Sequence, residues 1–199
     1  MSPFQRERLA LFTMTAAVFL IILAPELGYV PLWDGFVYAR CAIDAASSGI
    51  TVESLRCAGH PSQGYALFLA LSQLARPGNV VAMHLTNVAL GVLALACFRL
   101  VLARAFPARE HARQLDLLTL ACAVHPVLLS TLLQVNVDFG VYVFFFASLA
   151  ALMYGKFDWA AAAGTLLCFS KETGVLAYAL MVGLYAAVDA MGDAGTVRA

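Results

Sequence analysis

The chain contains the stretch VVAMHLTNVALGVLALACF at residues 80–98. No Asp, Glu, Lys or Arg interrupts it. A helix needs about 20 predominantly apolar residues to cross the roughly 30 Å hydrocarbon layer of a bilayer. Within that layer, only helices and closed barrels satisfy all of their backbone hydrogen bonds. The stretch therefore predicts a membrane-spanning helix, and the rest of the chain is interpreted around it.

The composition extends this prediction to the whole chain. Of the 199 residues, 62% are hydrophobic and 12% are charged, and the mean hydropathy is +0.84. Soluble domains have about 25% charged residues, so we expect a polytopic protein that has the lipid bilayer as a partner. The net charge is zero, with 12 basic and 12 acidic residues, which provides no electrostatic basis for binding nucleic acid.

Six apolar segments follow one another along the sequence. We predict membrane spans near 9–32, 80–103, 115–136, 138–155, 158–171 and 173–189. The predicted fold is therefore an all-α membrane protein with a single transmembrane domain over residues 1–199 and a long first outer loop at 33–79. Inside this loop, the apolar run at 65–75 is too short to cross a bilayer. It is interpreted as an interfacial or re-entrant helix packed on the bundle.

Basic residues determine the expected orientation. Arg6 and Arg8 precede the first segment, and a group of arginines at 99–113 separates the second segment from the third. Because cytoplasmic loops carry an excess of Lys and Arg, we expect a cytoplasmic N-terminus in the inner or plasma membrane, with the loop at 33–79 extracytoplasmic. The first apolar run is longer than the apolar region of a signal peptide and no small-residue cleavage site follows it. We therefore expect it to be retained as an anchor.

The fifth apolar segment is short for a membrane span. Its core at 159–170 rises only about 18 Å as a helix. Lys171 and Glu172 would then lie within the depth of the membrane. Either the helix breaks near Gly174, or the charged pair lines a wet cavity, because ionisable groups at such depth face a cavity or a partner.

Five cysteines occur, at positions 41, 57, 97, 122 and 168. The last three lie in apolar runs and are interpreted as small buried hydrophobic residues. Cys41 and Cys57 share the outer loop, where an oxidising compartment would allow a disulfide between them. Two free thiols are the alternative. The sequence has no CxxC pair and no Cys/His cluster with zinc spacing.

Asp34 lies beside aromatic residues at the end of the first apolar segment, in the sequence WDGFVYAR at 33–40. A carboxylate at the mouth of a membrane cavity can accept a proton from an incoming nucleophile, and partial desolvation makes it a stronger base. We therefore consider Asp34 a candidate general base. In the alternative interpretation, Trp33 and Tyr38 are interfacial residues and Asp34 only stops the helix.

Two further polar groups interrupt the apolar sequence. Asp138 lies between the third and fourth segments, where it and Asn136 are either cavity residues or turn and N-cap residues. Lys171 could neutralise a lipid phosphate, and Glu172 could hold that lysine or a hydroxyl substrate. Alternatively, Lys171 and Glu172 pair with each other in a loop.

Other polar residues lie within the apolar segments themselves. We expect His84, Asn87 and His125 to make interhelical hydrogen bonds rather than to bind a metal. His60 precedes the short apolar run of the outer loop and is expected to face the loop cavity. The predicted topology brings one set of polar residues to the same side of the membrane: Asp34, His60, Asp138, Lys171 and Glu172.

This pattern resembles the N-terminal part of the multi-spanning GT-C glycosyltransferases, the group that contains protein O-mannosyltransferases and the aminoarabinose transferases of lipid A. Those enzymes have a long first outer loop that opens with an acidic motif followed by Tyr-Ala, which matches residues 33–40. Their Pro and following aromatic-rich helix match residues 60–78. A later Pro and an Asp that opens the fourth span match Pro126 and Asp138, and a Lys-Glu followed by Gly matches residues 171–174.

The resemblance implies sugar transfer from a polyprenyl-phosphate donor to an acceptor on the outer face, with sugar and acceptor left unassigned. Asp34 would be the general base, Lys171 would face the donor phosphate, and Asp138 would shape the cavity through Arg40 or His60. The substrate-binding residues would be Tyr38, Arg40, His60, Asp138, Lys171 and Glu172. Many relatives have a second acid where this chain has Gly35. A divalent metal therefore stays an open question, and no metal ligand is assigned.

Two other classes of protein compete with this interpretation. Members of the family are at least twice as long, so the chain is expected to be such an enzyme or the N-terminal portion of one. A small transporter or lipid-binding subunit would use the same outer cavity for binding without reaction, although no repeated broken helices indicate transport. In the third interpretation, the chain is a scaffold subunit whose polar clusters only stabilise its turns.

Overall fold

The computed structural model describes residues 3–57 and 59–196, with side chains over residues 12–188 except at 58 and 109. The described residues form nine α-helices and no β-strand. The helices are α1 (Pro3–Leu23), α2 (Asp34–Ser48), α3 (Gln63–Gln73), α4 (Val80–Ala105), α5 (Ala112–Ala123), α6 (Pro126–Leu133), α7 (Val137–Met153), α8 (Phe157–Cys168) and α9 (Glu172–Thr196). The prediction of an all-helical fold is thus confirmed for this part of the chain.

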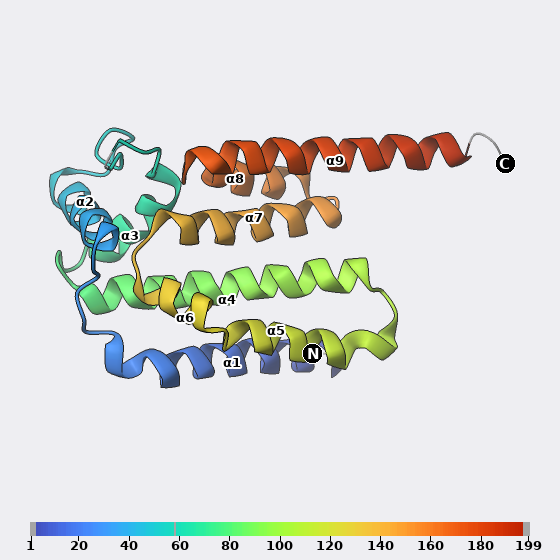
Figure 1. Cartoon of the computed structure of the whole chain (residues 1–199), viewed down its shortest axis with the longest axis horizontal. Coiled ribbons are helices and arrows are strands. Elements are labelled where there is room, and N and C mark those ends of the chain that lie inside the picture. Colours follow the sequence, from blue (N-terminus) through green and yellow to red (C-terminus); the bar gives the residue numbers. More distant parts are fainter. Residues whose placement is uncertain (1–2, 58, 197–199) are drawn as a thin grey trace.

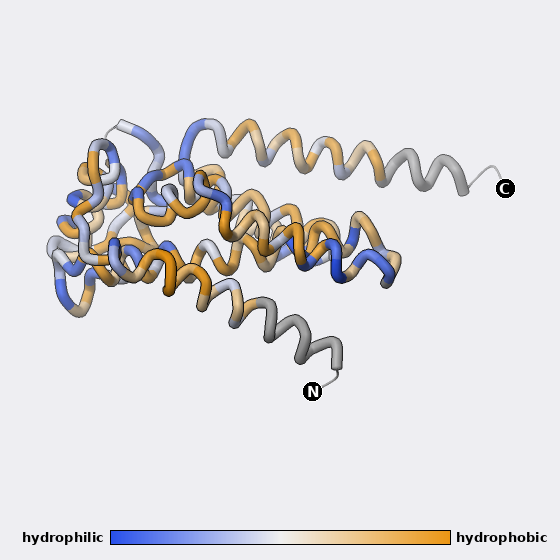
Figure 2. Tube along the Cα trace, turned by 60° about the horizontal axis from the view of Figure 1, so that its bottom comes forward, coloured by the Kyte–Doolittle hydropathy of each residue, from blue (hydrophilic) through white to orange (hydrophobic). Residues whose placement is uncertain are grey.

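The longer helices run side by side along the long axis of the molecule, and α2 and α3 pack against one end of them (Figure 1). At that end α1, α6 and α8 stop, and α4, α7 and α9 begin (Figure 1). We call it the α2–α3 end. The α4–α5 and α7–α8 turns lie at the opposite end (Figure 1). Hydrophilic residues gather at the two ends, and hydrophobic residues follow the helices between them (Figure 2).

The first helix ends earlier than the sequence predicted. A 3-10 turn at Ala24–Glu26 follows α1, and residues 27–33 lead to α2 without helical structure. Pro25 lies in this turn, and a proline interrupts a helix because it lacks an amide hydrogen and clashes with the preceding turn. The predicted span at 9–32 is therefore wrong in its last residues.

The third apolar segment consists of two helices rather than one. The axes of α5 and α6 differ by 51°. The His125 side chain accepts a hydrogen bond from the Val127 amide at 3.3 Å, and Pro126 occupies the first turn of α6. Proline suits that position because the amide it lacks would have no partner there. His125 thus caps a helix and makes no interhelical hydrogen bond through its side chain within the described residues, in contrast to the prediction.

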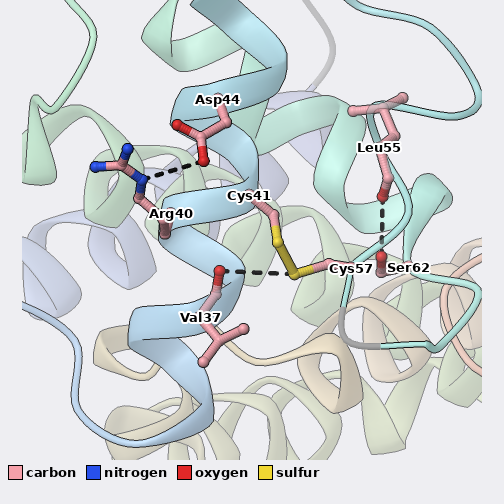
Figure 3. Close-up of a disulfide and its surroundings, with 7 residues drawn as sticks. All are labelled: Val37, Arg40, Cys41, Asp44, Leu55, Cys57 and Ser62. Carbon is pink, nitrogen blue, oxygen red and sulfur yellow. Dashed lines mark hydrogen bonds and ion pairs between the residues drawn. A yellow bond between two sulfur atoms is a disulfide. The ribbon is translucent and has the colours of Figure 1, made fainter.

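The predicted outer loop contains two helices. The run at 65–75 was predicted to be helical, and α3 over Gln63–Gln73 confirms this. The helix α2 over Asp34–Ser48 was not located from the sequence, and Asp34 begins this helix instead of stopping the previous one. A disulfide joins Cys41 of α2 to Cys57 (Figure 3), which confirms the disulfide prediction and excludes two free thiols.

Small residues allow α3 to lie very close to the bundle. A side chain at Gly64 would overlap the Leu166 carbonyl oxygen of α8, and a Cβ at Gly140 of α7 would lie 2.6 Å from the Tyr65 Cβ. Tyr65 is fully buried, and its hydroxyl donates to the Asn87 Oδ1 at 2.7 Å. The position of α3 is therefore fixed by α4, α7 and α8 together.

Polar side chains of α4 bind backbone groups of neighbouring segments. The two ring nitrogens of buried His84 lie 2.8 Å from the Leu27 oxygen and 3.1 Å from the Leu133 oxygen. The Asn87 Nδ2 donates to the Leu132 oxygen at 3.0 Å. Carbonyl groups at the end of a helix have no partner within it, and these side chains provide one. The predicted hydrogen bonds of His84 and Asn87 between segments are confirmed.

One described helix is long and apolar enough to cross a bilayer, namely α4. The α5–α6 pair meets the same criterion only if the two bent helices are counted as one span. The apolar parts of α1, α7, α8 and α9 are shorter. Large hydrophobic side chains nevertheless remain on the outside of several helices: Ile21 is 75% exposed, Leu117 58% and Leu184 67%.

Candidate functional site

Six of the residues predicted to form a site come together at the α2–α3 end. We call them the polar cluster: Asp34, Tyr38, His60, Asp138, Lys171 and Glu172. They come from the start of α2, the segment before α3, the start of α7, and the junction between α8 and α9. The cluster therefore depends on how four separate parts of the chain pack together.

An ion pair links the α8–α9 junction to the start of α7. The Lys171 Nζ lies 2.7 Å from the Asp138 Oδ1. The hydrogen bond to Asp138 raises the pKa of Lys171, and burial acts in the opposite direction. The Asn136 side chain accepts a hydrogen bond from the Asp138 amide at 3.1 Å. Asn136 thus caps α7 and holds the backbone from which the Asp138 carboxylate extends.

A second pair links the loop before α3 to the start of α9. The His60 Nδ1 lies 2.9 Å from the Glu172 Oε1, and both side chains are about half exposed. The hydrogen bond from His60 lowers the pKa of Glu172. Consecutive residues of the α8–α9 junction, Lys171 and Glu172, therefore bind two different elements, and the alternative that they pair with each other is wrong.

Tyr38 lies among the charged members of the polar cluster. Its side chain is buried, at 7% exposed. Burial raises the pKa of the Tyr38 phenol, and the nearby negative charge of Asp34 raises it further, while Lys171 lowers it. The carboxylates of Asp138 and Glu172 also raise the pKa of Tyr38. Because its pKa is raised, the phenol of Tyr38 stays protonated at neutral pH.

Asp34 has a different environment from the other two carboxylates. Its side chain is exposed and has no hydrogen-bond or ion-pair partner among the described residues. Trp33 precedes it with a φ of 55° and is 90% exposed. A Cβ at Gly35 would lie 3.3 Å from the Val135 nitrogen and oxygen, so α2 begins directly against the α6–α7 junction. The partial desolvation expected for Asp34 is not provided by the described residues.

Arg40 does not join the polar cluster. Its Nε donates to the Asp44 Oδ2 one turn further along α2, at 3.1 Å, and both side chains are exposed (Figure 3). Since Asp138 pairs with Lys171 and His60 pairs with Glu172, the expected link from Asp138 to Arg40 or His60 is wrong.

No family model, curated protein or solved structure matches the chain. Within the described residues, no group of three or more His, Cys, Asp or Glu side chains is arranged to hold a metal ion.

Several residues that support the polar cluster were not identified from the sequence. The Gly64 amide donates to the Phe169 oxygen at 2.8 Å, which attaches the start of α3 to the segment before Lys171. The Ser62 hydroxyl donates to the Leu55 oxygen at 2.9 Å (Figure 3). In the sequence, Gly64 directly before the apolar run at 65–75 is the signal of this close packing.

Proposed function

We propose that the chain is an integral membrane protein with the α2–α3 end at the extracytoplasmic surface. Two observations support this proposal. The α4 helix is long and apolar enough to cross a bilayer, and exposed hydrophobic side chains on α1, α5 and α9, such as Ile21, Leu117 and Leu184, would contact lipid. Soluble monomers rarely expose large contiguous apolar patches. The six spans of the predicted topology belong to this proposal, with α5 and α6 as one bent span.

We propose further that the polar cluster is the site of a GT-C-type glycosyltransferase, or of the N-terminal portion of one. The observation that supports this most directly is the difference between Asp34 and Asp138. The carboxylate of Asp34 is free and exposed, whereas that of Asp138 is neutralised by Lys171 at 2.7 Å. An inverting transfer needs one base for the acceptor and stabilisation of the departing phosphate, and Asp34 and Lys171 would take these two roles.

The proposed reaction moves a sugar from a polyprenyl-phosphate donor to an acceptor. The acceptor hydroxyl or amine attacks the anomeric carbon, and the bond from that carbon to the phosphate oxygen breaks. The electron pair leaves with the phosphate, whose negative charge Lys171 would stabilise. The proton of the acceptor passes to Asp34. The bound substrates would have to exclude water from Asp34, because its side chain is exposed in the free protein.

A lipid-binding subunit without catalytic activity is the second candidate. One observation favours it: the Asp34 side chain is exposed in the free protein, so it lacks the partial desolvation that would make it a stronger base. The cluster would then hold a lipid headgroup without reacting with it.

Binding and turnover of a polyprenyl-phosphate sugar by the purified full chain, beside the Asp34→Asn variant, test both candidates. Glycosyl transfer that is lost in the variant, while donor binding is kept, supports the enzyme. Donor binding without turnover in the natural chain supports the lipid-binding subunit. Absence of both binding and turnover contradicts both candidates.

A further inference from the structure

The disulfide joins α2 to the segment that precedes α3. Cys41 and Cys57 are 16 residues apart in sequence, and their Cα atoms lie 6.0 Å apart. Cys57 is buried, at 3% exposed, and its Sγ lies 3.6 Å from the Val37 oxygen of α2 (Figure 3). Two separate contacts therefore hold Cys57 against the helix on which Asp34 also lies.

His60 is attached to Cys57 through the backbone. The His60 amide donates to the Cys57 oxygen at 3.0 Å, and the two residues form an isolated β-bridge. The imidazole of His60 lies 2.9 Å from Glu172 at the start of α9. A short chain of contacts thus runs from Cys41 to Glu172 through Cys57 and His60.

Other contacts hold the neighbouring backbone but do not reach the His60 side chain. Ser62 binds the Leu55 oxygen at 2.9 Å, within the same segment. Gly64 binds the Phe169 oxygen at 2.8 Å and fixes the first turn of α3. Neither contact connects the segment before α3 to α2. The disulfide is the covalent cross-link between that segment and α2.

We infer that the Cys41–Cys57 disulfide is a positioning element that holds His60 against Glu172. It thereby fixes the start of α9 relative to α2, and so fixes Glu172 and Lys171 relative to Asp34 and Tyr38. The inference goes beyond the proposed function, since it concerns the geometry of the polar cluster and holds for a catalytic site and for a binding site alike.

The test is the titration of the Glu172 carboxylate, followed by carbon-13 NMR of glutamate-labelled full chain in detergent. The Glu172→Gln variant assigns the resonance. Dithiothreitol reduces the disulfide: two electrons and two protons pass to the cysteines, the sulfur–sulfur bond breaks, and the reagent becomes a cyclic disulfide. Because the hydrogen bond from His60 lowers the pKa of Glu172, we expect this pKa to rise on reduction, toward its value in the His60→Asn variant.

Two controls make the result specific. In the His60→Asn variant, reduction should leave the pKa of Glu172 unchanged, because the group that the disulfide positions is gone. The carboxylate resonance of Glu110, in the α4–α5 turn at the opposite end, should have the same position in the oxidised and reduced proteins at a fixed pH. The Cys41→Ala/Cys57→Ala pair, which adds no polar group at a buried position, should reproduce the effect of reduction.

Two outcomes would overturn the inference. One is an identical pKa of Glu172 in the oxidised and reduced chains. The other is a general loss of helix by circular dichroism in both the reduced chain and the alanine pair, because the disulfide would then stabilise the fold as a whole and would have no particular effect on His60.

Discussion

Lys171 and Asp138 are 33 residues apart in the sequence, and their side chains meet with 2.7 Å between Nζ and Oδ1. The next residue, Glu172, binds His60, which is 112 residues away. The short junction between α8 and α9 therefore binds two elements: Lys171 binds the start of α7, and Glu172 binds the loop before α3. The Asp34 carboxylate, in contrast, has no such partner among the described residues.

The Asp34→Asn substitution should abolish glycosyl transfer and leave membrane insertion intact. Asparagine has nearly the same shape but cannot accept the proton of the acceptor. Removal of a general base typically lowers the rate by a factor of about 10²–10⁴. The measurement is the initial rate of sugar transfer by the purified variant in detergent.

Asp44→Asn is the matched control for this experiment. Asp44 is also an exposed carboxylate of α2, and its partner Arg40 lies outside the polar cluster. Transfer by this variant should equal that of the natural chain. Full activity in Asp34→Asn would exclude Asp34 as the base.

The Lys171→Ala substitution should weaken binding of the donor more than binding of the acceptor, because the ammonium group is expected to face the donor phosphate. The hydrogen bond to Asp138 raises the pKa of Lys171. The contribution of the Lys171 charge to donor binding should therefore be complete below the ordinary lysine pKa and be lost as the pH rises through the raised pKa. Donor and acceptor dissociation constants, measured by isothermal calorimetry, provide the comparison.

Lys156→Ala, in the α7–α8 turn at the opposite end, is the control for charge removal. It should leave both dissociation constants unchanged. Equal weakening of donor and acceptor binding in Lys171→Ala would count against a phosphate-binding role. The ion pair itself is partly exposed, so its loss should cost only about 0.2–1 kcal/mol of stability.

Local sequence patterns predicted most of the helices, although not α2, and they could not predict which charged residues would pair. The apolar run from Val80 marks α4 well, because hydropathy is a property of the segment itself. The bend before Pro126 and the early end of α1 near Pro25 also have local causes, although a count of apolar residues overlooks them. The choice of Lys171 as the partner of Asp138 depends on how α7, α8 and α9 pack. No spacing in the sequence encodes this choice.

The disulfide should make Cys41 and Cys57 resistant to labelling by maleimide until the denatured protein is reduced. Replacement of both by alanine should reduce the free energy of unfolding by about 3 kcal/mol, the value expected for a closed loop of roughly 15 residues. Labelling with mass spectrometry and unfolding in denaturant provide the two measurements. Cys97, Cys122 and Cys168 are free and serve as the control, because they should be labelled in the denatured protein without reductant. Ready labelling of Cys41 under the same conditions would contradict the disulfide.

The Gly140→Ala substitution should destabilise the fold, because the added Cβ would lie 2.6 Å from the Tyr65 Cβ. Inserting a methyl group into a well-packed contact typically costs about 1–3 kcal/mol. Gly183→Ala on α9 is the matched control, since its Cβ would meet no described atom within 4 Å and alanine favours a helix over glycine by about 1 kcal/mol. The temperature of thermal unfolding should therefore fall in Gly140→Ala and rise in Gly183→Ala. A decrease of the same size in both variants would contradict the close approach of α3 to α7.

The two tryptophans of the chain provide a test of the proposed membrane orientation. Trp33, 90% exposed, lies at the α2–α3 end, and Trp159, 75% exposed, lies in the first turn of α8 near the opposite end. Tryptophan is enriched at both membrane–water interfaces. In vesicles of brominated phosphatidylcholine, the Trp33→Phe and Trp159→Phe variants should each be quenched more by bromine near the headgroup than by bromine near the chain end.

Leu93→Trp, placed at a 45% exposed position near the middle of α4 in a background without the natural tryptophans, should show the reverse order. A bilayer that contains the helices between two interfaces requires both results. Strong quenching of Leu93→Trp by aqueous iodide, with none by either lipid, would show that α4 faces water and would contradict the proposed membrane span.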